Sequence, residues 1–181
     1  AVVCRLLLEK KYLVVAEGAD PVPADGEVVV EVAFAAVNFP DVLIVANQYQ
    51  VSVPTPFVPG SEFAGVVTAV GSAVSSVRVG DRVAGSVLSG AFAEKVSARA
   101  DSLTLIPDSV PLDHAAGFWV THATAYHSLR SVAEMKSGER VLVLGAAGGV
   151  GTAAVSIARL LGGEVIAAAS SPDKLEACRR L

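Results

Sequence analysis

The chain contains few of the residues that mark secreted, metal-binding or membrane proteins. It has two cysteines among 181 residues, and Cys4 and Cys178 lie far apart without the spacing of metal ligands, so we expect reduced structural thiols. No apolar run approaches the length of a membrane span, and the first residues lack the charged and then apolar pattern of a signal peptide. These absences predict a cytoplasmic protein without a membrane partner.

Charged and aromatic residues are also scarce. Charged residues make up 18% of the chain, aromatic residues make up 6%, and the formal net charge is -4. The basic residues are scattered, apart from Arg179 and Arg180, where positive charge suits the end of a helix. Because there is no basic patch, no nucleic-acid partner is expected. A hydrophobic content of 52% is typical of an ordinary soluble enzyme.

The sequence after residue 140 is the most informative part of the chain. Residues 141–144 predict a buried strand that runs into a glycine-rich loop. The helix that follows is expected to open at about Gly149 and to extend over residues 152–161. Glycines at such a turn let the backbone approach the pyrophosphate of a dinucleotide, and the helix N-terminus supplies free N–H groups. A purely structural turn is the alternative. The context favours a dinucleotide site in which Gly148, Gly149 and Val150 contact the pyrophosphate.

Residues 165–169 predict the second strand of this unit, after a Gly-Gly pair ends the helix. An NAD site places Asp or Glu at the end of that strand, whereas this chain has Ser170 and Ser171, followed by Lys174. Two hydroxyls and a cation suit a 2′-phosphate, so we predict that these three residues select NADPH over NADH. The alternative is that Ser171 caps a helix and Lys174 is solvated, and both interpretations can hold together.

Upstream of the dinucleotide unit, short β-branched runs broken by glycine and proline predict a small, irregular β domain. The expected strands are residues 27–37, 65–70, 81–87 and 91–97, with a short helix at 41–46 and helical sequence at 113–118 and 121–133. We therefore expect an α/β chain with two domains, residues 1–110 and residues 111–181.

Six motifs, spread over nearly the whole chain, follow one another in a specific order. They are Asn-Phe-Pro-Asp at 38–41, Pro-Gly-Ser-Glu-Phe-Ala-Gly at 59–65, Val-Gly-Asp-Arg-Val at 79–83, Gly-Ala-Phe-Ala-Glu at 90–94, Thr-Ala-Tyr at 124–126, and the glycine loop at 145–151. Together they resemble the medium-chain dehydrogenase/reductase superfamily, and most closely its zinc-independent quinone oxidoreductase branch. The resemblance implies a partly open, chaperonin-10-like β-barrel followed by a Rossmann domain, with substrate and nicotinamide in the cleft between them.

The resemblance also bears on zinc. Zinc-dependent relatives carry a cysteine where Asn38 stands and a histidine where Ser61 stands. A catalytic zinc needs three protein ligands, which Asn, Ser and the apolar surroundings of Val120 cannot supply. The four-cysteine structural zinc lobe is missing as well. We therefore expect no zinc.

Histidines and carboxylates elsewhere do not change this expectation. His114, His122 and His127 lie in the helical connector, and the spacing of the last two puts them on different faces of an α-helix, so we expect surface or packing roles. Asp41 and Glu62 can be interpreted as a catalytic carboxylate pair. A Pro-Asp helix start and a turn-stabilising glutamate are the interpretations we prefer.

The expected reaction is therefore one that needs no metal ion. NADPH delivers a hydride to an electron-poor quinone or conjugated enone, and the protein orients the two and places polar donors around the developing oxyanion. By resemblance, Asn38 would face the nicotinamide and the substrate carbonyl, Tyr49 would line the substrate mouth, and Thr124 would contact the nicotinamide. The structural alternatives are that Asn38 fixes a turn, Tyr49 is a half-buried loop aromatic, and Thr124 bonds its own backbone.

Members of this branch continue well past the second Rossmann helix, and they usually form homodimers through a part that this sequence does not contain. Three interpretations follow, in order of preference. The first is an NADPH-dependent quinone or enone reductase that turns over only with the remaining part. The second is a non-catalytic relative that acts as a nucleotide-sensing or partner-binding module. The third is an enoyl-thioester reductase of the same superfamily.

Overall fold

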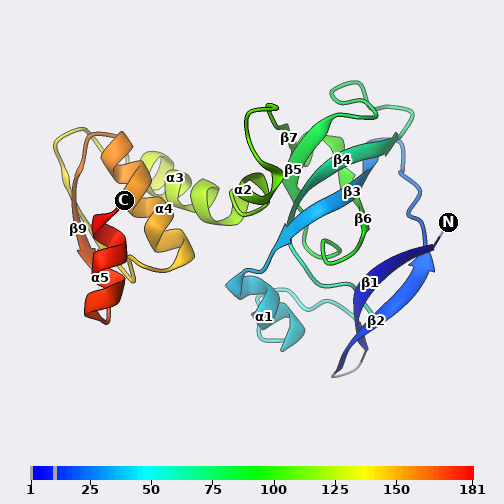
Figure 1. Cartoon of the computed structure of the whole chain (residues 1–181), viewed down its shortest axis with the longest axis horizontal. Helices are drawn as coiled ribbons and strands as arrows, with labels where there is room; N and C mark the ends of the chain where they lie inside the picture. Colours follow the sequence, from blue (N-terminus) through cyan, green and yellow to red (C-terminus); the bar gives the residue numbers. More distant parts are fainter. Residues whose placement is uncertain (1, 10–11) are drawn as a thin grey trace. The chain divides into compact units, whose positions relative to one another are not determined.

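Two units make up the chain, Ala1–Gly117 and Phe118–Leu181 (Figure 1). The computed structural model describes residues 2–9 and 12–181, except for the side chains of residues 2–4 and 9. Helix α2 (Leu112–Ala116) belongs to the first unit, because it packs against the sheet of that unit. The domain limits that we placed at residue 110 from the sequence remain a prediction.

The first unit is built on a five-stranded antiparallel sheet in the order β6-β3-β4-β5-β7. Along the chain its strands are β3 (Glu27–Ala36), β4 (Glu62–Val70), β5 (Arg82–Ser86), β6 (Lys95–Arg99) and β7 (Leu103–Leu105). A separate hairpin pairs β1 (Val2–Glu9) with β2 (Tyr12–Ala19), and helix α1 (Phe39–Val45) follows β3. The small, irregular β domain expected from the sequence is thereby confirmed.

Apolar side chains of the inner strands form the core of this unit. Val28 and Val30 of β3, Phe63 and Val67 of β4, and Val83 of β5 are all at most 1% exposed and pack into one cluster. β-Branched and aromatic side chains suit such a pleated, buried surface. Because a slip of one residue would turn these side chains to the other face, the core fixes the register of β3 and β4.

Gly65 lets β3 and β4 approach each other. It pairs with Val32 in the antiparallel register, and a Cβ atom at Gly65 would overlap the carbonyl oxygen of Glu31. A side chain at this position would therefore push the two central strands apart.

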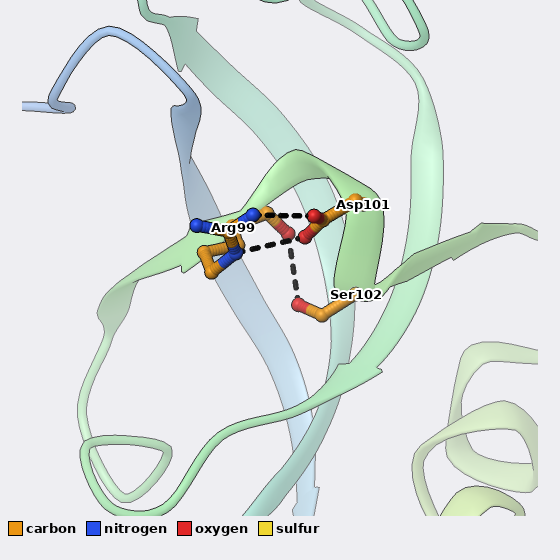
Figure 2. Close-up of polar contacts among 3 residues, drawn as sticks. All are labelled: Arg99, Asp101 and Ser102. Carbon is orange, nitrogen blue, oxygen red and sulfur yellow. Dashed lines mark hydrogen bonds and ion pairs between the residues drawn. The ribbon is translucent and has the colours of Figure 1, made fainter.

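The chain passes from β6 to β7 through a 3₁₀ turn, Ala100–Ser102 (Figure 2). Arg99 Nε donates to Asp101 Oδ1 at 3.0 Å, and Ser102 Oγ donates to the Arg99 carbonyl at 2.8 Å. The hydrogen bond from Arg99 lowers the pKa of Asp101, and the same bond raises the pKa of Arg99. Both side chains are exposed, so this ion pair makes a small contribution to stability.

The second unit contains a βαβα arrangement. Strand β8 (Arg140–Leu144) pairs in parallel with β9 (Glu164–Ala168), α4 (Gly149–Leu160) connects them, and α5 (Pro172–Arg179) follows. The strands and helices expected around the glycine loop are confirmed, and α4 begins at Gly149, where the sequence predicts that the helix opens. This unit is the partial Rossmann region of the expected fold.

The two faces of the β8–β9 sheet differ. One face contributes Val143 to a core with Val155 of α4 and Cys178 of α5. On the opposite face, the exposed aliphatic side chains are Leu142, Leu144 and Ile166, at 60%, 74% and 49% exposure. Parallel sheets normally bury both faces. The exposed second face is therefore a departure from an ordinary α/β unit.

The thiols can be described in part. Cys178 is buried and carries a free thiol, as expected. The side chain of Cys4 lies outside the described residues.

The helical connector is less regular than the sequence predicts. It consists of α3 (Thr124–Tyr126) between two π-helical segments, Trp119–Ala123 and His127–Val132. The Ala133 N–H donates to the Ser128 carbonyl at 2.9 Å, five residues back, where an α-helix would bond four back.

Nowhere in the described ranges is a helix both long and apolar enough to cross a bilayer.

We expect Gly65→Ala to lower the free energy of unfolding by about 2–4 kcal/mol, because the added methyl collides with the backbone of β3. Gly26→Ala is the matched control, since a Cβ atom there meets nothing within 4 Å. Urea unfolding of both variants measures the difference. Equal stability of the two variants would show that β4 can move away from β3 at little cost.

We expect Asp101→Asn to lower stability at pH 7 and to have no effect in strong acid. The folded pKa of Asp101 lies below its unfolded value. The carboxylate therefore stabilises the fold above the unfolded pKa of about 3.9, and the stabilisation is lost as the pH falls through the folded pKa. Urea unfolding at pH 7 and in strong acid checks this expectation. As a control, Asp101→Asn should not change the free energy of unfolding of a chain that already carries Arg99→Gln. A difference that persists in acid would contradict the ion-pair explanation.

Candidate functional site

The loop between β8 and α4 exposes backbone N–H groups to a ligand. Gly145 adopts a left-handed conformation with φ of 65°, and the Gly148 N–H donates to its carbonyl at 2.9 Å, which closes the turn. Gly148 is the N-cap of α4 and has no side chain to accept a hydrogen bond from the first turn. The first N–H groups of α4 are thus left for an outside acceptor such as a phosphate.

Close packing explains the other glycines of the loop. A Cβ atom at Gly151 would collide with the carbonyl oxygen of Gly145, and one at Gly149 would meet Thr121 Cγ2 at 3.1 Å. The helix therefore sits against the loop at a distance that only glycine permits. Val150, the third predicted contact, is in the first turn of α4 and is 43% exposed.

A pocket of about 370 Å³ lies beside this loop and continues to the end of β9. It is lined by Gly145, Ala147, Gly148, Ala168, Ala169, Ser170 and Lys174. Lys174 Nζ donates to Ser170 Oγ at 3.2 Å, so the two polar side chains at the far end of the pocket lie together. No carboxylate appears among the described residues that line it.

The structure separates the roles of the two serines. Ser170 lines the pocket, whereas Ser171 is the N-cap of α5 and accepts the Lys174 N–H at 3.4 Å. Asp173 is in the first turn of α5 and does not line the pocket. A hydroxyl, an ammonium group and unpaired helix N–H groups around one pocket fit a dinucleotide with an additional phosphate.

Asn38 lies in the first unit, between β3 and α1. It is the N-cap of α1, and its backbone N–H donates to Asp41 Oδ2 at 2.7 Å. Its side-chain Nδ2 donates to Glu62 Oε2 at 2.9 Å. Asp41 and Glu62 are the two buried charged residues of the described chain, at 3% and 0% exposure. Asn38 is therefore held at its backbone and at its side chain by two different carboxylates.

This arrangement corrects one interpretation and supports another. Asp41 lies in the first turn of α1, which begins at Phe39 with Asn38 as its N-cap, and this agrees with the Pro-Asp helix start. Glu62, which we interpreted as stabilising a turn, is instead the first residue of the central strand β4 and bonds to Asn38. A signal was present in the sequence, because a lone glutamate at the start of an apolar strand is seldom buried without a partner.

Tyr49 and Thr124 lie in different units. Tyr49 is half-buried and packs against the cluster of Leu8, Ile44 and Phe57, as its structural alternative predicts. Thr124 is an exposed residue at the start of α3, and its carbonyl accepts the Ser128 hydroxyl at 2.8 Å. The proposed contacts of these two residues with substrate and nicotinamide remain predictions.

The loop after α1 borders a pocket of about 290 Å³. Its lining residues are Leu8, Ile44, Val45, Asn47, Ser52, Val53, Pro54, Thr55 and Phe57. Ser52 Oγ donates to Asn47 Oδ1 at 2.8 Å, and Asn47 adopts a left-handed φ of 52°. This loop carries Tyr49, which the family resemblance assigns to the substrate mouth.

The positions of the zinc ligands in zinc-dependent relatives are occupied here by the Asn38 amide and by the Ser61 hydroxyl, whose oxygen is buried without a hydrogen-bond partner. His122 stacks on Phe118 with ring centroids 4.6 Å apart, and its Nδ1 lies 2.9 Å from Thr121 Oγ1. His114 and His127 are exposed. Within the described residues, no three His, Cys, Asp or Glu side chains are placed to hold a metal ion.

Comparison with known proteins gives matches over most of the chain. The family model described as the alcohol dehydrogenase GroES-like domain matches residues 24–108. The polyketide synthase GfsB of Streptomyces halstedii is 46% identical over 157 residues, which are 87% of this chain and 3% of that protein. Quinone oxidoreductase-like protein 2 of Rattus norvegicus is 40% identical over 175 residues, which are 96% of this chain and 49% of that protein.

Solved structures match both units. The quinone oxidoreductase of Thermus thermophilus, solved also in complex with NADPH, has a TM-score of 0.88 and 36% identity, over 98% of this chain and 57% of its own. The CurK enoyl reductase has a TM-score of 0.87 and 32% identity, over 99% of this chain and 57% of its own. The chain thus spans about half the length, or less, of these curated relatives and somewhat more than half of these solved chains.

The GroES-like match, the glycine loop and the agreement with solved oxidoreductases point to one family. The chain is similar to members of the medium-chain dehydrogenase/reductase superfamily of the quinone oxidoreductase type, in their GroES-like domain and in part of their Rossmann domain.

Proposed function

We propose that this chain is part of an NADPH-dependent, zinc-independent oxidoreductase that transfers a hydride to a quinone or a similar conjugated carbonyl compound. The observation that carries the proposal is the pocket beside Gly148, where Ser170 and Lys174 stand at the end of β9 and no carboxylate lines the described wall. A carboxylate there would hold a ribose 2′-hydroxyl and repel a 2′-phosphate, whereas a lysine attracts the phosphate.

Each part of the pocket has a role in holding NADPH. The N–H groups at the start of α4, at Gly149 and Val150, would bind the pyrophosphate, and Ser170 with Lys174 would bind the 2′-phosphate. Ser171 contributes by capping α5, which fixes the backbone from which Lys174 reaches Ser170. Bound NADPH supplies the hydride.

The acceptor side of the reaction needs a hydrogen-bond donor. When a quinone or enone receives a hydride, negative charge develops on its carbonyl oxygen, and a preorganised N–H group stabilises that charge. The amide of Asn38 is such a donor. Val37, Phe39 and Val42, which lie within four positions of Asn38 in the sequence, are 74%, 72% and 56% exposed, so apolar side chains of this segment are accessible to a flat, apolar acceptor. Tyr49 and Thr124 are the further contacts that the family resemblance assigns.

Zinc has no part in this proposal, because the residues at the zinc-ligand positions are an amide and a hydroxyl. We further propose a cytoplasmic protein that acts on a small molecule and has no nucleic-acid partner.

A second candidate is an enoyl-thioester reductase of the same superfamily. The observation in its favour is the 46% identity to a polyketide synthase, together with the match to the CurK enoyl reductase. Both candidates require the same NADPH pocket and the same donor at the acceptor carbonyl. They differ only in the acceptor.

We expect NADPH to raise the melting temperature of the 181-residue chain, as a ligand of the native state must, and NADH to raise it far less. Ser170→Asp combined with Lys174→Glu should weaken NADPH binding about ten- to a hundredfold, through the loss of charge-assisted hydrogen bonds, and should affect NADH little. Titration of nicotinamide fluorescence measures both affinities. Lys136→Glu is the matched control, because this exposed lysine does not line the pocket. Equal losses for both cofactors would refute the phosphate pocket.

We expect the protein, at its natural length, to oxidise NADPH with quinones faster than with enoyl thioesters. Asn38→Ala should lower kcat by about 10²-fold, because it removes a donor to the developing oxyanion, and should leave the affinity for NADPH unchanged. A panel of quinones, enones and enoyl thioesters measures the preference. A preference for thioesters would replace the first candidate by the second, and NADPH binding without turnover of any acceptor would refute both.

A further inference from the structure

The carboxylate of Glu62 is fully buried, and burial of a charged group is energetically unfavourable. Glu62 is 0% exposed and is the first residue of β4, which lies between β3 and β5 in the sheet. Transfer of a charged carboxylate out of water is strongly unfavourable unless hydrogen bonds compensate. An apolar side chain of similar volume would pack there without that cost, so the carboxylate calls for an explanation other than packing.

The hydrogen bond between Glu62 and Asn38 is directional. Its Oε2 accepts Asn38 Nδ2 at 2.9 Å, and Asp41 Oδ2 accepts the backbone N–H of the same asparagine at 2.7 Å. Glu62 comes from β4 and Asp41 from α1, so the two carboxylates hold Asn38 from two elements. Asp41 fixes the backbone from which the side chain extends, and Glu62 fixes the end of the side chain.

An ionised carboxylate can only accept hydrogen bonds. The asparagine amide has an NH₂ group on one side and an oxygen on the other, and the two differ little in size. With Glu62 present, the NH₂ group must face the carboxylate, and a flipped amide would place two oxygens against each other. Glu62 therefore selects one of the two orientations of the Asn38 amide.

We propose that Glu62 is a positioning residue that holds the Asn38 amide with its second N–H directed at the carbonyl oxygen of the acceptor. This inference rests on the proposed function, in which Asn38 is the donor to that oxygen. The flipped amide would present its own oxygen to the developing oxyanion and would destabilise it. Glu62 acts through Asn38 and does not itself touch the substrate or the cofactor.

Two variants of similar volume separate the hydrogen bond from packing. Glu62→Gln keeps an oxygen that can accept Asn38 Nδ2, whereas Glu62→Leu fills the space without an acceptor. The first test needs no turnover and uses the side-chain amide signals of Asn38 in the NMR spectrum of the 181-residue chain, identified by their loss in Asn38→Ala. We expect a downfield, slowly exchanging amide proton in the native chain and in Glu62→Gln, and its loss in Glu62→Leu.

The second test measures turnover of NADPH with the preferred acceptor by the protein at its natural length. Glu62→Leu should lower kcat by about 10²-fold, the effect expected when a reacting group is misplaced, whereas Glu62→Gln should remain within a few fold and the affinity for NADPH should not change. Glu62→Leu should add no further loss to Asn38→Ala, because the two residues act as one unit. Glu17→Gln, at an exposed glutamate of β2, is the control.

The outcomes distinguish this inference from the proposed function. An unchanged Asn38 amide signal in Glu62→Leu, or additive losses in the double variant, would overturn the positioning role even if the protein is an active reductase. Absence of turnover in the native protein would overturn the proposed function and with it the role of Asn38 as a donor. An Asn38 signal that depends on Glu62, together with non-additive losses, would support the positioning role.

Discussion

The register between β3 and β4 is the constraint on which the arrangement of Asn38 and Glu62 in the first unit depends. Ala36, the last residue of β3, pairs with Glu62, the first residue of β4. Asn38 follows β3 by two residues, so this pairing brings its side chain to the carboxylate although the two residues are 24 positions apart. The core residues hold the register, and Gly65 allows the strands to come close enough for it. A shift by one residue would turn Glu62 to the other face of the sheet and separate it from Asn38.

In the second unit, the pairing of two parallel strands brings together the residues of the proposed cofactor pocket. Leu144 pairs with Ala168, so β8 and β9 end side by side, and the residues that follow them meet at one edge. Gly145 follows β8, and Ser170 follows β9 closely. One pocket therefore contains both the glycine loop, which offers backbone N–H groups, and the polar side chains of Ser170 and Lys174, to which we assign the choice between the two dinucleotides. In each unit, strand pairing brings together the residues that sequence separates.

The sequence predicted those features whose signals are local. The glycine loop, the two parallel strands, the helix cap at Ser171 and the placement of Asp41 in the first turn of α1 each depend on a few consecutive residues, and the structure has all of them. The contact between Glu62 and Asn38 was missed because the two residues are distant in sequence and only the β3–β4 pairing brings them together. The π-helical segments beside α3 were missed because a helical sequence pattern does not show whether each N–H bonds to the carbonyl four or five residues back. The six sequence motifs together predicted the family, because their combination in one order along the chain is more specific than any single motif.

Both candidate acceptors require the same hydrogen-bond donor from Asn38, so other residues must determine which acceptor is preferred. A quinone and an enoyl thioester both develop negative charge on a carbonyl oxygen when a hydride arrives, so a fixed N–H donor serves either. A residue that stabilises both transition states equally cannot discriminate between them, because specificity is a difference between two transition-state affinities. Discrimination must come from groups that contact the rest of the acceptor. In this unit the loop at residues 47–55, which borders a pocket of about 290 Å³ and packs Tyr49 against Ile44 and Phe57, is the element with the side chains and the space to make that difference.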